Sequence, residues 1–127
     1  MDYNIEVRKG DVHFADMSGG IGAEQRGFRP VLIIQNDTGN RFSPTTFIAP
    51  LTASTTKKRL PTHVEIKAHE CGLRKASVVM LEQARVIDKS RLKGYYTSIS
   101  NEIMTKVDTA IAIEFGLAIP HASSVVA

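Results

Sequence analysis

The feature that most constrains the fold is a run of four apolar residues, Val31 to Ile34, set between turn-forming segments. A run of this kind is typical of a strand that is buried on both faces. Pro30 precedes the run and biases Arg29 towards an extended backbone, which would hold the guanidinium at the start of the strand. The run therefore predicts a central strand with a cation at its open end.

A second run, ending at Thr52, would return from this strand through a polar turn over residues 35–40 and form a hairpin. Pro50 lies two residues before Thr52, and because proline cannot donate to a strand ladder it predicts an edge or a bulge. A guanidinium and a hydroxyl would then lie where the two strands leave the core. Further polar side chains near the predicted strand ends are Glu24, Gln25, Asn36, Ser54, Glu82, Gln83 and Arg85.

The rest of the chain reads as short strands followed by one long helix. The other predicted strands cover residues 12–15, 62–67, 77–87 and 95–99. Asp88 would cap a single helical turn over 88–92, and Ser100 would cap a helix that begins near Asn101 and stops at Pro120. In that helix one apolar stripe contains residues 103, 104, 107, 110, 111, 115 and 118. The order predicts a mainly β, or α+β, fold: a small twisted sheet or barrel with a C-terminal helix.

The loop over residues 17–27 contains four glycines and leads into a strand. It lacks the Lys-Ser/Thr ending of a phosphate-binding P-loop, which also leads into a helix rather than a strand. Long irregular loops in compact domains are usually functional or disordered. The loop is therefore predicted to be a mobile flap beside a site.

The 127 residues predict one domain over 1–127, in which residues 121–127 form a frayed tail. No window approaches the roughly 18 apolar residues of a membrane span, and the polar start is unlike a secretory leader. The lone Cys71 cannot form an internal disulfide, so a reducing cytoplasm is expected. Its thiol is interpreted as packed or idle.

The charge is uneven along the chain, whose formal net charge is +3. Residues 17–60 contain six basic and two acidic residues, a local excess of +4. Such an excess favours a polyanion or an acidic peptide as a partner, although a solvated basic rim would have the same composition.

Several catalytic classes are disfavoured. The four histidines are scattered away from the hairpin, which argues against a catalytic triad, and no carboxylate cluster suits magnesium. A zinc hypothesis arises from His63, Glu65, His69, Glu70 and Cys71. The segment lacks paired C-x-x-C or H-x₃₋₅-H spacing, so exposed polar residues are the preferred interpretation. No metal and no cofactor are expected.

RNA offers a chemistry that these residues suit. Its own 2′-hydroxyl can attack the adjacent phosphorus, so the protein must only orient the chain, stabilise charge and manage protons. Arg29 suits the phosphoryl charge because its fork presents paired donors, and Thr52 would donate one more hydrogen bond. Arginine stays protonated at neutral pH, so the general base is left open. The simpler interpretations are a surface Arg29 paired with Glu24 and an ordinary strand Thr52.

The chain resembles the MazF/PemK toxins of bacterial toxin–antitoxin modules, and is most similar to those of Gram-positive bacteria. The resemblance is carried by ordered blocks that span nearly the whole chain up to the C-terminal helix: Gly10-Asp11-Val12, Glu24-Gln25, residues 27–37 (GFRPVLIIQND), 39–45 (GNRFSPT), 61–65 (PTHVE) and 81–88 (LEQARVID). It implies a homodimeric SH3-like β-barrel.

The resemblance also implies a metal-independent endoribonuclease that cuts single-stranded RNA, leaving a 2′,3′-cyclic phosphate and a 5′-hydroxyl. Arg29 and Thr52 match the family's catalytic pair, and Glu24-Gln25 and Glu82-Gln83 match pairs near the substrate. A MazE-like antitoxin would inhibit by laying an acidic tail over the RNA groove. The alternatives are a non-enzymatic CcdB-like toxin that poisons a protein such as gyrase, and a barrel that only binds RNA or peptide.

Overall fold

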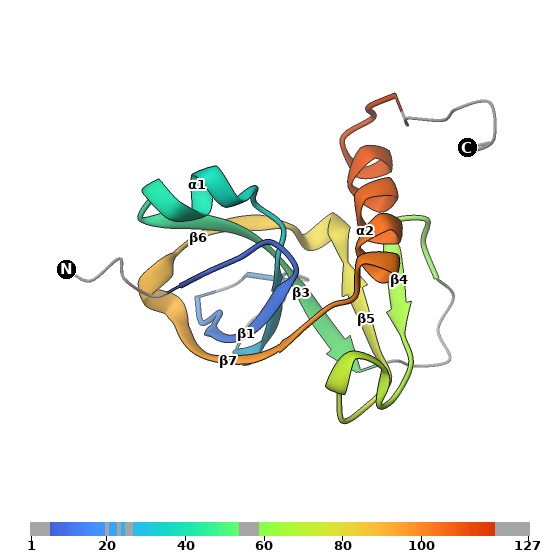
Figure 1. The fold of residues 1–127 in the computed structure, drawn as a ribbon, viewed down its shortest axis with the longest axis horizontal. Coiled ribbons are helices and arrows are strands. Elements are labelled where there is room, and N and C mark those ends of the chain that lie inside the picture. Colours follow the sequence, from blue (N-terminus) through green and yellow to red (C-terminus); the bar gives the residue numbers. More distant parts are fainter. Residues whose placement is uncertain (1–5, 20, 23, 25–26, 54–58, 119–127) are drawn as a thin grey trace.

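The computed structural model describes residues 6–19, 21–22, 24, 27–53 and 59–118. Within these residues, seven strands form one antiparallel sheet in the order β4-β5-β3-β2-β1-β7, and β6 pairs with the remaining part of β3 (Figure 1). The elements are β1 (Asp11–Asp16), β2 (Phe28–Ile33), α1 (Asp37–Phe42), β3 (Thr45–Ala53), β4 (His63–Ile66), η1 (Glu70–Gly72), β5 (Ser77–Met80), η2 (Leu81–Gln83), β6 (Arg85–Asp88), η3 (Lys89–Arg91), β7 (Leu92–Ser98) and α2 (Asn101–Glu114).

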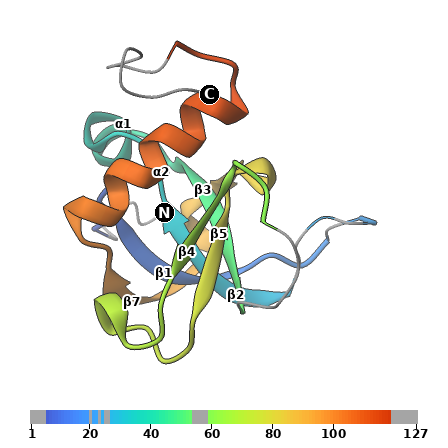
Figure 2. The same cartoon turned by 90° about the vertical axis from the view of Figure 1, so that its right-hand side faces the viewer.

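The mainly β architecture with a C-terminal helix is confirmed, but the sheet does not close into the predicted barrel. Its two end strands, β4 and β7, do not pair in the described part of the chain. The strands β1, β2, β3, β6 and β7 curl around one side, and α2 covers the other (Figures 1 and 2). No helix among the described residues is long and apolar enough to cross a membrane.

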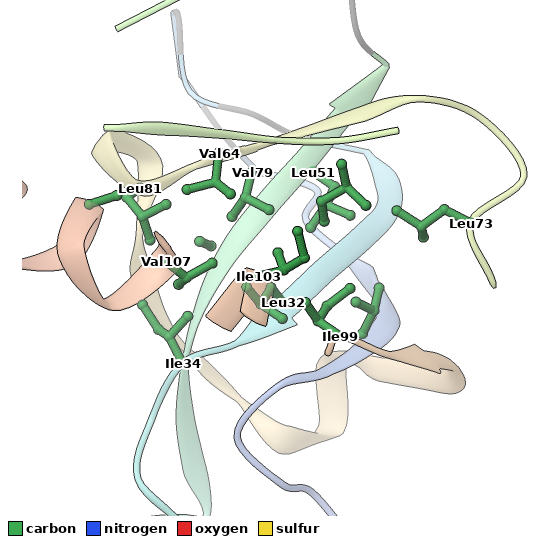
Figure 3. Packing of buried hydrophobic residues seen from close by; sticks show 14 residues of the cluster. Leu32, Ile34, Leu51, Val64, Leu73, Val79, Leu81, Ile99, Ile103 and Val107 are labelled. Atoms are coloured by element: carbon green, nitrogen blue, oxygen red, sulfur yellow. The ribbon is translucent and has the colours of Figure 1, made fainter. Parts of the chain in front are cut away.

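Two clusters of buried side chains lie on the two faces of this sheet. The larger packs Leu32 and Leu51 of the central strands against Ile103 and Val107 of α2 (Figure 3). The smaller lies inside the curl and contains Val31, whose side chain points away from that of Leu32 because side chains alternate along a strand. The run from Val31 therefore fills both cores, as its unbroken apolar character predicted.

The predicted single strand over residues 77–87 is wrong, because 3₁₀ helix η2 divides it into β5 and β6. On one edge of β3, β6 pairs with Thr45 to Ile48 and β5 pairs with Leu51 to Ala53. Pro50 lies in the gap between these two registers. The missing N–H of Pro50 thus lies where no strand pairs with this edge of β3, between β5 and β6. The strand β3 itself is continuous and central rather than an edge strand.

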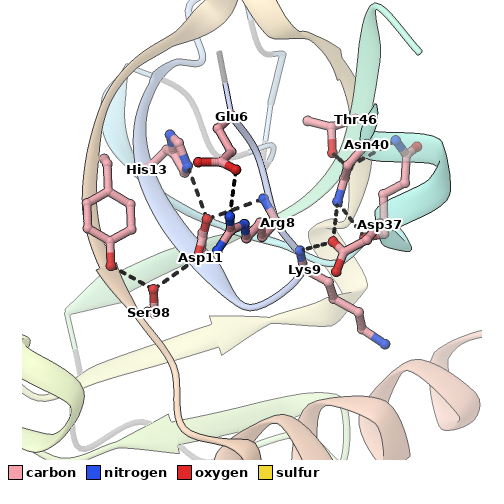
Figure 4. Close-up of polar contacts among 11 residues, drawn as sticks. Glu6, Arg8, Lys9, Asp11, His13, Asp37, Asn40, Thr46 and Ser98 are labelled. Carbon is pink, nitrogen blue, oxygen red and sulfur yellow. Dashed lines mark hydrogen bonds and ion pairs between the residues drawn. The ribbon is translucent and has the colours of Figure 1, made fainter. Parts of the chain in front are cut away.

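The predicted turn over residues 35–40 is replaced by helix α1. Asn36 caps it by accepting a hydrogen bond from the Gly39 amide at 2.8 Å. Asn40 is the buried residue of α1. Its side chain accepts a hydrogen bond from Thr46 Oγ1 at 2.8 Å and donates one to the Gln35 carbonyl at 2.9 Å (Figure 4). The helix is held by this polar network on the end of the β2–β3 pair.

The predicted caps of the later elements are confirmed. The Asp88 side chain accepts from Ser90 N at 2.8 Å, and Ser100 Oγ accepts from Ile103 N at 3.3 Å at the start of α2. However, α2 ends at Glu114, before Pro120, because Gly116 adopts a positive φ of 66° and its amide bonds back to the Ile113 carbonyl. Pro120 and the predicted tail over 121–127 lie outside the described residues.

Candidate active site

The two residues predicted to be catalytic lie opposite each other at the open end of the β2–β3 pair. The register between these strands pairs Val31 with Pro50, Leu32 with Ala49 and Ile33 with Ile48. Extended outward by two residues, the same antiparallel register places Arg29 opposite Thr52. Both residues lie beyond the last recorded pair, Val31 with Pro50, and they line one pocket.

A pocket of about 590 Å³ surrounds this pair of residues. Both Arg29 and Thr52 line it and are half-buried, which leaves their side chains accessible to a ligand. Two further cations, Arg74 and Lys75, also line it, and its described lining residues include no carboxylate. Thr52 and Ser77 add hydroxyl groups. A pocket with three cations and neutral donors suits a phosphate group.

A second pocket, of about 410 Å³, lies next to the first along β3. Pro50 lines the second pocket, whereas Leu51 and Thr52 line the first. Four of the residues predicted to bind substrate meet in this second pocket: Glu24, Glu82, Gln83 and Arg85. The structure therefore brings these four together beside the Arg29–Thr52 pair, although they come from the loop before β2 and from the η2–β6 region.

The carboxylate of Glu82 is held by two neighbours. Its Oε2 lies 2.7 Å from His63 Nε2, and its Oε1 accepts from Thr62 Oγ1 at 3.1 Å. His63 Nδ1 accepts from the Leu60 amide at 3.1 Å, so the neutral ring must carry its proton on Nε2 and donate it to Glu82. His63 reaches Glu82 because the β4–β5 pairing brings β4 next to η2.

One predicted site residue lines a different pocket, and two others fall outside the described residues. Asn36 is the N-cap of α1 and lines a different pocket of about 380 Å³ with Lys9 and Phe115. It follows β2, whereas Arg29 lies at the start of that strand, so the two residues lie at opposite ends of β2. Gln25 and Ser54 lie outside the described residues.

Glu24 has its own local contact in the loop before β2. Its Oε1 accepts from the Ile21 amide at 2.9 Å, and its own amide donates to the Ile21 carbonyl at 3.1 Å. This small ring of hydrogen bonds shapes the described part of the loop beside the second pocket.

The residues that complete the first pocket were missed by sequence reasoning. Phe14 and Tyr96 come from β1 and β7, and Arg74 and Lys75 from the segment before β5. The adjacent cations at 74 and 75 were the one available signal, since a basic pair directly before a strand suits a strand-end site.

The described residues contain no group of three or more His, Cys, Asp or Glu side chains close enough to hold a metal ion.

Comparison with known proteins agrees with this architecture. The family model of PemK-like, MazF-like toxins of type II toxin–antitoxin systems matches residues 8–115. Endoribonuclease EndoA of Bacillus subtilis strain 168 is 54% identical over 111 residues, which cover 87% of this chain and 96% of the relative.

Solved structures share the fold at lower identity. MazF of Deinococcus radiodurans superposes with a TM-score of 0.76 at 21% identity, over 90% of this chain and 100% of that one. An endoribonuclease in complex with its cognate antitoxin, from a mycobacterial species, superposes with a TM-score of 0.73 at 24% identity, over 90% of this chain and 99% of that one. With a family match over most of its length and a relative of this identity, the chain belongs to the PemK-like, MazF-like toxins of type II toxin–antitoxin systems.

Proposed function

We propose that this chain is a metal-independent endoribonuclease toxin that cuts single-stranded RNA at a short sequence. The observation that carries the proposal is that Arg29 and Thr52 line one pocket, whose described lining residues include three cations and no carboxylate. The 54% identity to a protein named endoribonuclease EndoA supports the reaction class, and it favours RNA cleavage over a CcdB-like poison of a protein target.

In the proposed reaction, the 2′-oxygen of the substrate forms a bond to the adjacent phosphorus while the bond from phosphorus to the 5′-oxygen breaks. The products are a 2′,3′-cyclic phosphate and a 5′-hydroxyl. The proton lost by the 2′-hydroxyl passes to a base that is left unassigned, and the 5′-oxygen gains one. Arg29 stabilises the negative charge on the phosphoryl oxygens, and Thr52 donates a hydrogen bond to them.

The second pocket would read bases rather than phosphates. Two of its side chains are carboxylates, Glu24 and Glu82, which repel phosphate but accept hydrogen bonds from the amino groups of bases. Gln83 can both donate and accept, and Arg85 can bind a carbonyl edge or a flanking phosphate. Gln25 and Ser54 keep their predicted role in substrate binding, and Asn36 does not.

We further infer the partners and the compartment. The chain would act in the cytoplasm as a homodimer and would be neutralised by a MazE-like antitoxin. Relatives have been solved with antitoxins, including a MazE–MazF complex of Deinococcus radiodurans that covers 91% of this chain with a TM-score of 0.72. An acidic, extended antitoxin segment would complement the cation-lined pocket that the RNA phosphates would otherwise occupy.

The test is digestion of a long, weakly structured RNA by the purified chain in excess EDTA. We expect discrete fragments whose 5′ ends accept phosphate from polynucleotide kinase without prior phosphatase treatment, and whose 3′ ends are cyclic phosphates. Intact RNA together with growth arrest on expression would overturn the proposal in favour of a protein target. RNA binding without either effect would identify a binding module.

A further inference from the structure

Three aromatic rings form a stacked column across three neighbouring strands beside the first pocket. The ring of Phe14 in β1 lies between those of Phe28 in β2 and Tyr96 in β7. The Phe14 and Phe28 centroids are 5.8 Å apart with 4° between the ring planes, and those of Phe14 and Tyr96 are 4.9 Å apart with 11°. All three rings are thus nearly parallel.

The strand registers explain why the rings align. Phe14 is paired with Pro30 of β2 and with Gly94 of β7. Phe28 is two residues from Pro30, so its side chain lies on the same face of the sheet as that of Phe14. Tyr96 lies at a register irregularity between β1 and β7, and its ring contact with Phe14 places its side chain on that face too. These strands lie side by side in the fold (Figure 2).

One end of the column is anchored and the other is open. The Tyr96 hydroxyl accepts a hydrogen bond from the Arg74 amide at 3.0 Å, which fixes that ring against the segment before β5. Phe14 is half-buried and contacts both neighbouring rings. Phe28 ends the column and is 66% exposed, although burial of its large apolar ring would stabilise the fold. The fold therefore presents a pre-oriented aromatic ring to the solvent.

This column borders the same pocket as Arg29 and Thr52. Phe14 and Tyr96 line the pocket together with that pair, and Phe28 directly precedes Arg29 in β2. Successive strand residues point to opposite sides, so the Phe28 ring and the Arg29 guanidinium flank the open end of β2. A single strand of nucleic acid that crosses this end would meet a phosphate ligand on one side and a ring on the other.

We propose that the column is a stacking subsite for an unpaired base next to the cut phosphate, with Phe28 as the contacting ring and Arg74 and Lys75 as ligands of a neighbouring phosphate. This inference rests on the proposed endoribonuclease function. Bases of single-stranded RNA stack on exposed aromatic side chains with little sequence preference, and basic residues beside the ring follow the backbone.

The charges select RNA over a second copy of the chain as the occupant. If a second copy docked on this pocket about a two-fold axis, its three cations would face the same three cations of the first copy: Arg29, Arg74 and Lys75. Like charges in such positions repel. The phosphates of a single-stranded nucleic acid complement them instead. A base held in a duplex is already stacked on its neighbours, so the subsite also favours an unpaired substrate.

The experiment measures binding apart from cleavage. The cut site is first mapped on a long RNA, and an oligonucleotide that spans it is made with a 2′-deoxy sugar at the cut position, which removes the nucleophile. We expect Phe28→Ala to raise the Kd for this oligonucleotide about tenfold to a hundredfold. Phe28→Trp should restore the wild-type Kd or lower it.

The matched control is Phe42→Ala in α1, which removes another exposed phenylalanine, 76% accessible, that does not line this pocket. Its Kd should match the wild type. A Phe28→Ala variant that binds as tightly as the wild type would overturn the subsite while leaving the proposed function intact. A Phe28→Ala variant that loses its self-association would show that a second copy covers the ring, which also overturns it. Wild-type protein that leaves all-ribose RNA intact would instead overturn the proposed function.

Discussion

The opposed positions of Arg29 and Thr52 predict that their contributions to RNA cleavage are coupled rather than independent. Removing one preorganised donor to a developing oxyanion costs about 10²–10³ in rate, or about 2.7–4 kcal/mol. We expect this loss for Arg29→Ala. A hydrogen bond to a charged group contributes about 1.5–3 kcal/mol, so Thr52→Ala should lower the rate about tenfold to a hundredfold.

Two independent losses would sum to about 4–7 kcal/mol in the double variant. Because the register places both side chains on one face and one phosphate would accept from both, neither can work fully without the other. Residues that share a network show coupling of about 0.5–3 kcal/mol. The double variant should therefore cut faster than the product of the two single effects predicts.

The assay is a double-mutant cycle of single-turnover cleavage rates, measured with enzyme in excess and with EDTA present. Neither residue belongs to the two buried clusters, so each variant should unfold within about 1 kcal/mol of the wild type in urea. Full activity in either single variant would refute the site assignment. Strict additivity would refute the shared-phosphate geometry even if both residues matter.

Two further predictions concern the folded state. Lys89 is 1% exposed and its ammonium donates to the Asn40 carbonyl at the end of α1, so Lys89→Ala should lose about 3–5 kcal/mol in urea unfolding, from three buried methylenes and an unpaired carbonyl. Lys89→Met, which keeps most of the stem, should lose less. Burial lowers the pKa of His13 more than nearby Asp11 raises it, so below about pH 6.5 the unfolded chain binds a proton that the folded chain does not. Stability should therefore fall from pH 7.5 to 5.5, and His13→Phe should fall less over that interval; an equal fall in both would contradict the assignment to His13.

The sequence predicted the central hairpin and its end residues because those features are local. The apolar run from Val31 and the proline after Arg29 each act on their own neighbours, and a hairpin register follows once two strands are identified. The same holds for α2, where the Ser100 cap and the apolar stripe are contiguous signals. Its end was misplaced because the positive φ of Gly116 stops the helix before Pro120 is reached.

The break between β5 and β6 could not be read from residues 77–87 alone. Its cause lies on another strand, where Pro50 offers no donor to a neighbour, so the adjoining chain turns through η2 at that level. Helix α1 was missed for a different reason. Asn36 and Asp37 are good signals for a helix start, but the glycine and the asparagine that follow also suit a turn, and the buried network of Asn40 decides between them.

The candidate site shows the same division between local and distant information. Arg29 and Thr52 were predictable as strand ends. By contrast, Phe14 and Tyr96 reach the first pocket only through the pairings of β1 and β7, and His63 reaches Glu82 only through the pairing of β4 with β5. No spacing in the sequence predicts these contacts, because each contact depends on which strands become neighbours in the sheet.

Pro50 also marks the boundary along β3 between the two pockets of the candidate site. The pocket beyond it holds the cations and hydroxyls that suit phosphate, and the pocket beside it holds the carboxylates and the amide that suit bases. Chemistry that acts on the phosphate is common to every RNA sequence, whereas hydrogen bonds to base edges carry the sequence information. Substitutions such as Gln83→Ala can therefore alter which sites are cut while leaving the Arg29–Thr52 pair intact. A toxin built in this way can change its target sequence without rebuilding its catalytic residues.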